Sequence, residues 1–287
     1  MADSPGLGPV ALCTLLATDG DALVGAYTHW LHQQVAEAGP LDADTAAAIG
    51  YPQLAGARSW LLCNRVGRPW LQVIEERGAL SRDSLHSYGW MALEVLVADV
   101  DDLADSLQDS PFTLLRPPAD LDLSDRIRAC QVRGPAGEIL YLTQIRGDVP
   151  PFELPTCEAP VDHLFIPVLS SPSREQSLAQ YSGIAGSSGL SFETKITVLN
   201  QARGYALDRR HPVATLQLAG RCLLEIDEVA GTIEPAPGVY SGMACVAFHC
   251  ANPPPAGAIT PASGPFAGRP VSSHRGCAGE HFTLVYR

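Results

Sequence analysis

A twelve-residue segment occurs twice in the chain, and this repeat limits the possible folds more than any other feature. Residues 134–145 are GPAGEILYLTQI and residues 276–287 are GCAGEHFTLVYR, which agree at the first, third, fourth, fifth and ninth positions. Each copy is a glycine-rich turn followed by a predicted strand. Because the copies lie about half the chain apart, we predict a duplicated architecture in which both halves end on this turn and strand.

The residues before the first copy predict one β-α-β-β-β module. An apolar run at 91–98 indicates a strand, and residues 100–107 then change to a helical period, with Asp99 placed to cap the first helical turn. Further strands are predicted at 112–115, 127–133 and 139–145, separated by Pro-Pro and Gly-Pro-Ala-Gly turns.

The same order of elements recurs elsewhere in the chain. From Val161 we predict a strand at 164–169, a helix from about Ser171 to just before Gly183, and strands at 190–199, 213–218 and 222–227. A first module opens with a strand at 10–17 and ends with one at 70–75, whereas prolines 253–255 occupy the place of the helix in a degenerate fourth module. The predicted modules span about 8–80, 88–147, 160–230 and 238–287, in an N-terminal domain (1–150) and a C-terminal domain (158–287) joined by a proline-rich linker.

Charge and composition narrow the classes of partner. The formal net charge is −12 and Lys195 is the single lysine, so neither nucleic acid nor an anionic membrane is an expected partner. No apolar stretch approaches the roughly 20 residues of a membrane span, and no basic segment precedes the weakly apolar residues 10–17. The eight cysteines are scattered without a C-x-x-C pair, which favours free thiols in a reducing compartment. We therefore expect a cytoplasmic protein, and a homodimer is possible.

The four modules, the sequence Val161-Asp-His-Leu at the opening of the third, and the Gly-x-x-Gly-Glu turns together resemble the vicinal-oxygen-chelate superfamily of glyoxalase I, extradiol dioxygenases and related isomerases. The resemblance covers nearly the whole chain. It implies an α+β fold in which four βαβββ modules form two cup-shaped domains of mixed β-sheet. It also implies that a divalent cation is held by residues from the first and last strands of the modules.

Carried onto this sequence, the resemblance gives His163 and Glu225 as the first-strand and last-strand positions of module three. In module two it gives Ala92, with Glu94 two residues on and therefore on the same face, and Tyr141 with Thr143. If modules two and three pair, Glu94, Tyr141, His163 and Glu225 are expected to meet in one cup. The predicted ligands of a divalent Mn, Fe, Mg, Ni or Zn ion are Glu94, His163 and Glu225. The predicted catalytic groups are Glu94, Tyr141 and His163. Gln131 and Thr143 are predicted to bind the substrate. Asp227 and Glu228 are interpreted as solvated charges at a strand end.

These residues predict a metal-dependent lyase or isomerase that acts on a hydrophobic carbonyl compound, with an aromatic compound favoured. The metal would stabilise an enolate or alkoxide, and a carboxylate such as Glu94 would move a proton. Two alternatives stay open. One is an Fe(II) ring-cleaving dioxygenase, which is weakened because module four has no histidine at the matching position. The other is a metal-free protein that binds and sequesters a hydrophobic small molecule.

Overall fold

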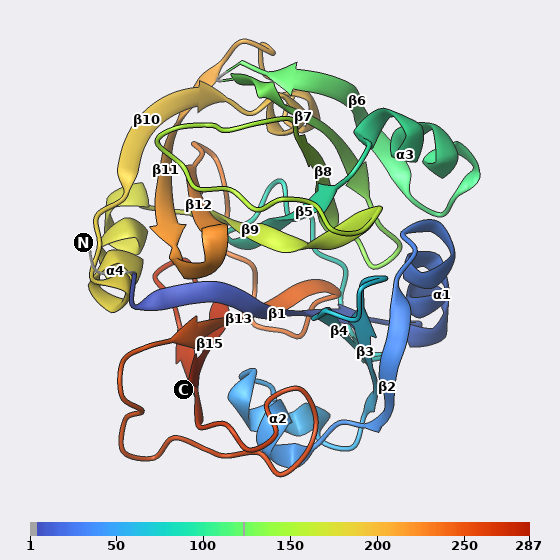
Figure 1. Cartoon of the computed structure of the whole chain (residues 1–287), viewed down its shortest axis with the longest axis vertical. Coiled ribbons are helices and arrows are strands. Elements are labelled where there is room, and N and C mark those ends of the chain that lie inside the picture. The colour runs from blue at the N-terminus through green and yellow to red at the C-terminus, as the bar shows by residue number, and fades with distance from the viewer. Residues whose placement is uncertain (1–4, 123) are drawn as a thin grey trace.

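The computed structural model describes residues 5–122 and 124–287, and these form the four predicted modules in chain order (Figure 1). The first contains β1 (Leu7–Ala17), α1 (Gly20–Trp30), β2 (Gln34–Pro40), α2 (Ala43–Ala48), β3 (Arg58–Cys63) and β4 (Pro69–Glu75). The second contains β5 (Gly89–Val97), α3 (Val100–Ser106), β6 (Thr113–Leu121), β7 (Ser124–Arg133) and β8 (Ile139–Ile145). The third contains β9 (Val161–Ser171), α4 (Arg174–Ala185), β10 (Leu190–Lys195), α5 (Thr197–Ala202), β11 (Arg210–Leu218) and β12 (Cys222–Glu228). The fourth contains β13 (Gly242–Cys250), β14 (Val271–Arg275) and β15 (His281–Tyr286).

The strands form two mixed sheets, and each sheet combines modules from both halves of the chain. One sheet has the order β14-β15-β13-β1-β4-β3-β2, so modules one and four join through antiparallel β1 and β13. The other has the order β10-β11-β12-β9-β5-β8-β7-β6, so modules two and three join through antiparallel β5 and β9. The linker between residues 150 and 158 therefore separates modules along the chain, but it does not separate the two sheets.

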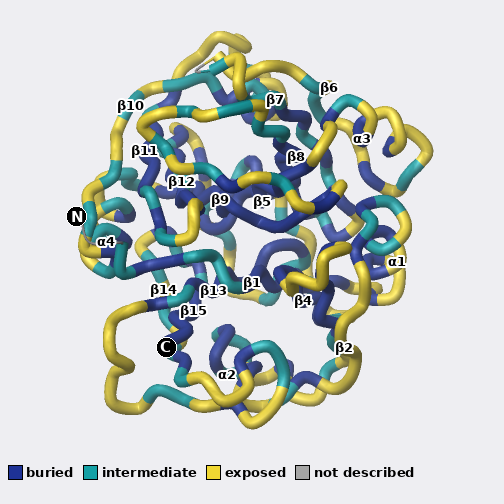
Figure 2. Tube along the Cα trace, in the orientation of Figure 1, coloured by how far each residue is buried: buried dark blue, intermediate teal, exposed yellow. Residues whose placement is uncertain are grey.

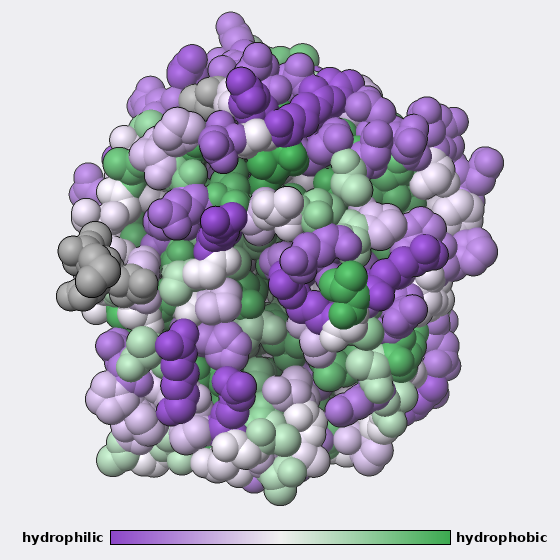
Figure 3. All heavy atoms as spheres, in the orientation of Figure 1, coloured by the Kyte–Doolittle hydropathy of each residue, from purple (hydrophilic) through white to green (hydrophobic). Residues whose placement is uncertain are grey.

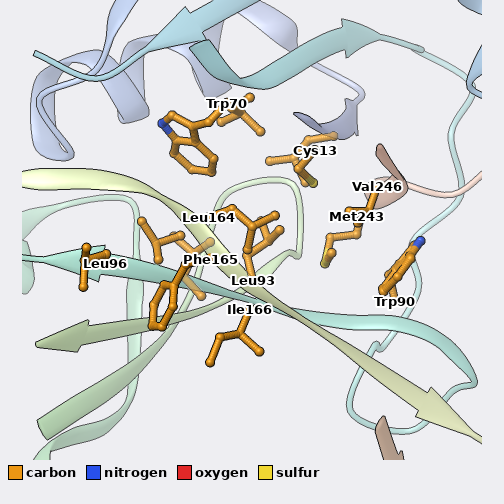
Figure 4. Packing of buried hydrophobic residues seen from close by; sticks show 14 of the residues in the cluster. Cys13, Trp70, Trp90, Leu93, Leu96, Leu164, Phe165, Ile166, Met243 and Val246 are labelled. Atoms are coloured by element: carbon orange, nitrogen blue, oxygen red, sulfur yellow. The ribbon is translucent and has the colours of Figure 1, made fainter. Parts of the chain in front are cut away.

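The main hydrophobic core lies between the backs of the two sheets. Cys13, Trp70 and Met243 from one sheet pack close to Leu93 and Leu164 from the other (Figure 4). Alternate residues on each central strand point into this core, because successive side chains of a strand face opposite sides of a sheet. The central strands are accordingly buried, whereas the edge strands β2, β6 and β10 carry many exposed residues (Figure 2).

The concave faces of the two sheets, which point away from this core, differ in what covers them. In the sheet of modules one and four, Leu12 and Leu16 of β1 lie under Ala46 and Ala48 of α2 and under Phe266. These side chains are buried and fill most of the cup. In the sheet of modules two and three, part of the concave face is left open and holds a pocket of about 320 Å³, whereas the pocket beside α2 in the other cup is about 160 Å³.

The glutamate of the duplicated turn has a structural role. Glu138 accepts hydrogen bonds from the Tyr27 hydroxyl (3.0 Å) and the backbone N–H of Ala136. In the second copy, Glu280 accepts from the Tyr181 hydroxyl (2.8 Å) and the corresponding backbone N–H. A side chain at the first glycine of either turn would collide with this carboxylate. Each glutamate thus ties a turn to a helix of the preceding module.

Most predicted element positions are confirmed, with differences at helix ends. Asp99 caps α3 as predicted, accepting from two backbone N–H groups. Helix α4 starts later than predicted, because Ser173 is its N-cap, and it ends at Gly186, whose φ of 66° suits glycine. The strand predicted at 190–199 stops at Lys195 and continues as α5. No helix lies between β13 and β14, as the three prolines predicted. None of the described helices is long and apolar enough to cross a membrane.

Candidate functional site

The open cup of modules two and three contains a pocket of about 320 Å³. Its floor comes from the concave face of the sheet, and its walls come from β6, β10 and the start of α5, elements that Figure 1 labels or places in chain order. The face of the molecule shown in Figure 3 carries many hydrophilic side chains, with hydrophobic ones visible between them. The pocket is lined by apolar and polar side chains in mixture, and those used below are Glu94, Gln131, Tyr141, Thr143 and Glu225.

The register of the sheet explains why these five side chains share one face. Glu94 pairs with Tyr141 across β5 and β8, and Tyr141 in turn pairs with Gln131 on β7. Thr143 lies two residues after Tyr141 and therefore faces the same side. Glu225 lies on β12, separated from β5 by β9 alone. The expected pairing of modules two and three thus brings together Glu94, Gln131, Tyr141, Thr143 and Glu225 in one pocket, while their chemical roles stay predictions.

Two carboxyl groups, those of Glu94 and Glu225, line this pocket, and the carboxyl group of Asp227 lies next to that of Glu225. Glu94 is 8% exposed and Asp227 is completely buried, whereas Glu225 is partly exposed to the pocket. Burial, followed by repulsion from Glu225, raises the pKa of Glu94 to about 8. Burial raises the pKa of Glu225 to about 7, and a hydrogen bond with Asp227 opposes that rise. The pKa of Asp227 is raised well above its usual range, first by burial and then by Glu225.

Asp227 was interpreted from the sequence as a solvated charge, and this was wrong. Apart from the carboxyl group of Glu225, neither oxygen of its carboxyl group has a hydrogen-bond donor among the described residues, although both are buried. An ionised carboxylate in such surroundings is unfavourable, so Glu225 and Asp227 are best described as two adjacent acids that share a proton. The alternation Glu225-Ile226-Asp227 could have revealed this, because residues two apart on a strand lie on one face. Glu228, next in the chain, accepts a hydrogen bond from the backbone N–H of Arg174.

Neutral polar groups surround the acids. The Thr143 hydroxyl lowers the pKa of Glu94 and so offsets part of the effect of burial. The hydroxyl groups of Tyr141 and Thr215 are buried without a hydrogen-bond partner among the described residues. Thr215 pairs with Glu225 across β11 and β12 and was not predicted from the sequence. Unsatisfied buried hydroxyls beside a pocket are available to a bound molecule.

Two basic side chains stand at the rim and were also missed by the sequence analysis. Lys195 forms an ion pair with Asp122, and Arg116 donates to the side-chain oxygen of Gln201 (3.0 Å). Both line the pocket, with Phe192 and Ile196 forming apolar wall below them. The pocket therefore combines an acidic floor with an apolar wall and a basic rim.

His163 does not belong to this pocket, contrary to the prediction. Ile166 is paired with Glu94, so His163 lies three residues before the level of that carboxylate, or roughly 10 Å along the strand. Its Nδ1 is 2.8 Å from Asp162 Oδ1, and its ring nitrogens lie 3.0 and 3.2 Å from Arg68 Nη1. The histidine therefore helps to join β9 to the turn between β3 and β4.

The predicted metal-ligand set consequently does not come together. Among residues 5–122 and 124–287, no group of three or more His, Cys, Asp or Glu side chains is placed to hold one ion. Because Ala92 pairs with Val168 and Glu94 pairs with Ile166, the pseudo-twofold axis between β5 and β9 exchanges Ala92 with Ile166. The two first-strand ligand positions thus hold apolar side chains. A catalytic ion normally has three strong protein donors, so this donor set does not fit one.

The chain was compared with known proteins at the levels of sequence and structure. Neither a protein-family model nor a curated protein sequence matches it. Among solved structures, glyoxalase I from Zea mays is similar over 96% of this chain and 92% of that chain, with a TM-score of 0.61 and 15% identity. A proposed dioxygenase from Bacillus subtilis is similar over 99% of this chain and 86% of that chain, with a TM-score of 0.60 and 9% identity. The chain therefore shares the fold of these structures, and this confirms the fold class predicted from the sequence.

Proposed function

We propose that this protein is an enzyme that moves a proton on a small, largely apolar carbonyl compound, as an isomerase or a lyase. The observation that carries the proposal is the meeting of Glu94 with the Glu225–Asp227 acid pair at the base of one open pocket. A general base works best when its pKa lies near the working pH, and burial brings Glu94 into that range.

In the proposed reaction, the ionised fraction of Glu94 removes a proton from the carbon next to the substrate carbonyl. Protonated Glu225, which lines the pocket, donates a hydrogen bond to the carbonyl oxygen, where negative charge develops as the enolate forms. A carboxylic acid that stays neutral in an apolar site is a suitable donor for such an oxyanion. Glu94 then returns the proton to another atom in isomerisation, or the enolate expels a leaving group in a lyase reaction.

The pocket favours apolar substrates of limited size. A volume of about 320 Å³ lies at the lower end of the usual range for small-molecule sites. Phe192 and Ile196 form an apolar wall, and the hydroxyl groups of Tyr141 and Thr143 would orient the substrate by hydrogen bonds. These contacts favour a compound with one aromatic ring or a short aliphatic chain.

Exchange of carbon-bound protons with solvent tests the proposal without requiring the natural substrate. Aryl ketones and short-chain ketones are incubated with the protein in D2O, and loss of the α-proton signal is followed by NMR. Glu94→Gln is expected to reduce enzyme-dependent exchange at least about 100-fold, in keeping with the usual contribution of a general base. The matched control is Glu37→Gln, which changes an exposed glutamate on β2 and should exchange at the wild-type rate.

A second function is a protein that binds a hydrophobic compound without altering it, because the apolar wall and the incomplete donor set would serve binding equally well. If ketones bind, as measured by calorimetry, but the wild type accelerates exchange no more than Glu94→Gln does, binding without catalysis is the correct conclusion. If ketones bind and wild-type exchange exceeds that of Glu94→Gln, the enzymatic proposal stands.

A further inference from the structure

A second, smaller cavity lies at the margin of the filled cup, where a connector between modules crosses from one sheet to the other. Its volume is about 60 Å³. Arg82 lines it from the connector between β4 and β5. Arg275 and His281 line it from β14 and β15, in the sheet of modules one and four. Tyr51 and Tyr240 complete its walls. The cavity thus draws its side chains from segments that are far apart in the sequence.

Arg82 carries a charge that nothing in the described structure neutralises. Its Nη2 donates to the backbone oxygen of Trp90 (2.6 Å), whereas its Nε is buried and has no acceptor. Among the described residues, no carboxylate forms an ion pair with Arg82 or with Arg275. Burial lowers the pKa of Arg82, which means that the surroundings disfavour its charged form.

Two acidic groups lie near the cavity without supplying the missing charge. Glu280 is occupied by the hydroxyl of Tyr181 and by the backbone N–H of Ala278. Glu234 lines the mouth of the cavity but is exposed. A guanidinium removed from water is costly unless it is paired, and a planar donor group of this kind matches carboxylate and phosphate oxygens.

We propose that this cavity binds a small oxyanion of the carboxylate or phosphate type. Arg82 holds it from the inner side through its free Nε and Nη1, and Arg275, which is exposed at the mouth, approaches it from the other sheet. The volume of about 60 Å³ suits an oxyanion head group and excludes a bulky ligand. The Trp90 indole donates to the backbone oxygen of His281 (2.8 Å), so the wall that faces the anion is already fixed between the sheets.

Because the anion would bind the folded state across the seam, its binding should raise the unfolding temperature. We would record thermal unfolding of the wild type in acetate, inorganic phosphate, sulfate and chloride at one ionic strength. A concentration 100-fold above the Kd is expected to raise Tm by roughly 5 °C in a saturable manner. A response to acetate identifies the carboxylate group of an organic acid as the ligand, and a response to phosphate or sulfate alone identifies a phosphate-type group.

Variants separate this site from general salt effects. Arg82→Met and Arg275→Gln are each expected to weaken oxyanion binding at least about tenfold, whereas Arg65→Gln, which changes an exposed arginine outside the cavity, should bind as the wild type does. Since Arg82→Met could fail to fold, Arg275→Gln, which changes an exposed residue, provides an independent test. Isothermal calorimetry with the responding anion provides the Kd values.

Glu234 supplies the counter-test. If the site is for an external anion, Glu234→Gln removes a competing negative charge, and the affinity for the anion should stay equal or increase. The proposal is overturned if no oxyanion raises Tm in either the wild type or Glu234→Gln. It is equally overturned if the rise in Tm is the same in wild type, Arg275→Gln and Arg65→Gln.

Discussion

Replacing Glu94 with glutamine is expected to stabilise the protein, and by more at high pH than at low pH. The unfolded chain ionises this carboxyl group near its ordinary pKa of 4.5, whereas the folded protein keeps it protonated until about pH 8. Folding therefore takes up a proton between these two values. It follows that the free energy of unfolding falls as the pH rises through this window.

The size of the effect follows from the shift. Each pH unit inside the window costs about 1.4 kcal/mol, so the buried group costs about 1 kcal/mol at about pH 5 and about 4 kcal/mol at about pH 8. Glutamine keeps the shape of the side chain but has no charge to desolvate. Glu94→Gln should therefore exceed the wild type in unfolding free energy by amounts of this order, with the larger gain at the higher pH.

Urea denaturation followed by circular dichroism measures this difference at about pH 5 and about pH 8. Acids distant from residue 94 titrate alike in both proteins and cancel when the two are subtracted. Glu37→Gln serves as the control, because an exposed glutamate should give a difference that does not change with pH. A Glu94→Gln advantage that is constant with pH, or a variant less stable than the wild type at about pH 8, would refute the reasoning.

Three further predictions concern side chains outside the pocket. Tyr27→Phe and Tyr181→Phe should each lower the unfolding free energy by about 1–3 kcal/mol in urea denaturation, because each leaves a buried glutamate short of a donor; losses below about 0.5 kcal/mol would contradict the structural role of the repeated turn. Phe266→Ala should cost about 3–5 kcal/mol in the same assay, since it empties part of the filled cup, and an unchanged value would show that this cup is not closed by packing. His163→Ala should leave proton exchange within about twofold of wild type while lowering stability by about 1–3 kcal/mol, because Asp162 loses a partner; a tenfold loss of exchange would return His163 to the catalytic site.

The fold could be predicted because its evidence is local and repeated. The duplicated turn, the alternation along each strand and the cap at Asp99 all depend on neighbouring residues. Most of the side chains that line the pocket could be singled out for the same reason. An acid within an apolar strand, such as Glu94, stands out because a buried carboxylate is unfavourable unless it is paired or protonated. Period-two alternation then places Thr143 with Tyr141 without any knowledge of the tertiary structure.

The sequence could not predict the register in which neighbouring strands pair. His163 was assigned from its place near the start of a strand, but the register puts Ile166 opposite Glu94. A shift of a few residues along a strand changes no local pattern, so only the paired structure reveals it. The cavity around Arg82 was equally hidden, because its walls come from the connector before β5 and from β14 and β15, which are far apart in the sequence.

The pairing of β5 with β9 also explains why one cup can perform acid–base chemistry with a defined direction. The pseudo-twofold axis exchanges Glu94 with Val168, and it exchanges Tyr141 with Glu225, as their positions beside those strands show. A symmetric site would present equivalent groups to both sides of a substrate. Here the carboxyl group is on the first strand in one half and on the last strand in the other, so a base and an acid face the bound molecule from different places. A carbonyl compound can then bind productively in one orientation, with its oxygen toward Glu225 and its acidic carbon toward Glu94. The double variant Glu94→Val with Val168→Glu swaps these two side chains and leaves the composition of the cup unchanged. It should therefore abolish the exchange of substrate protons with D2O.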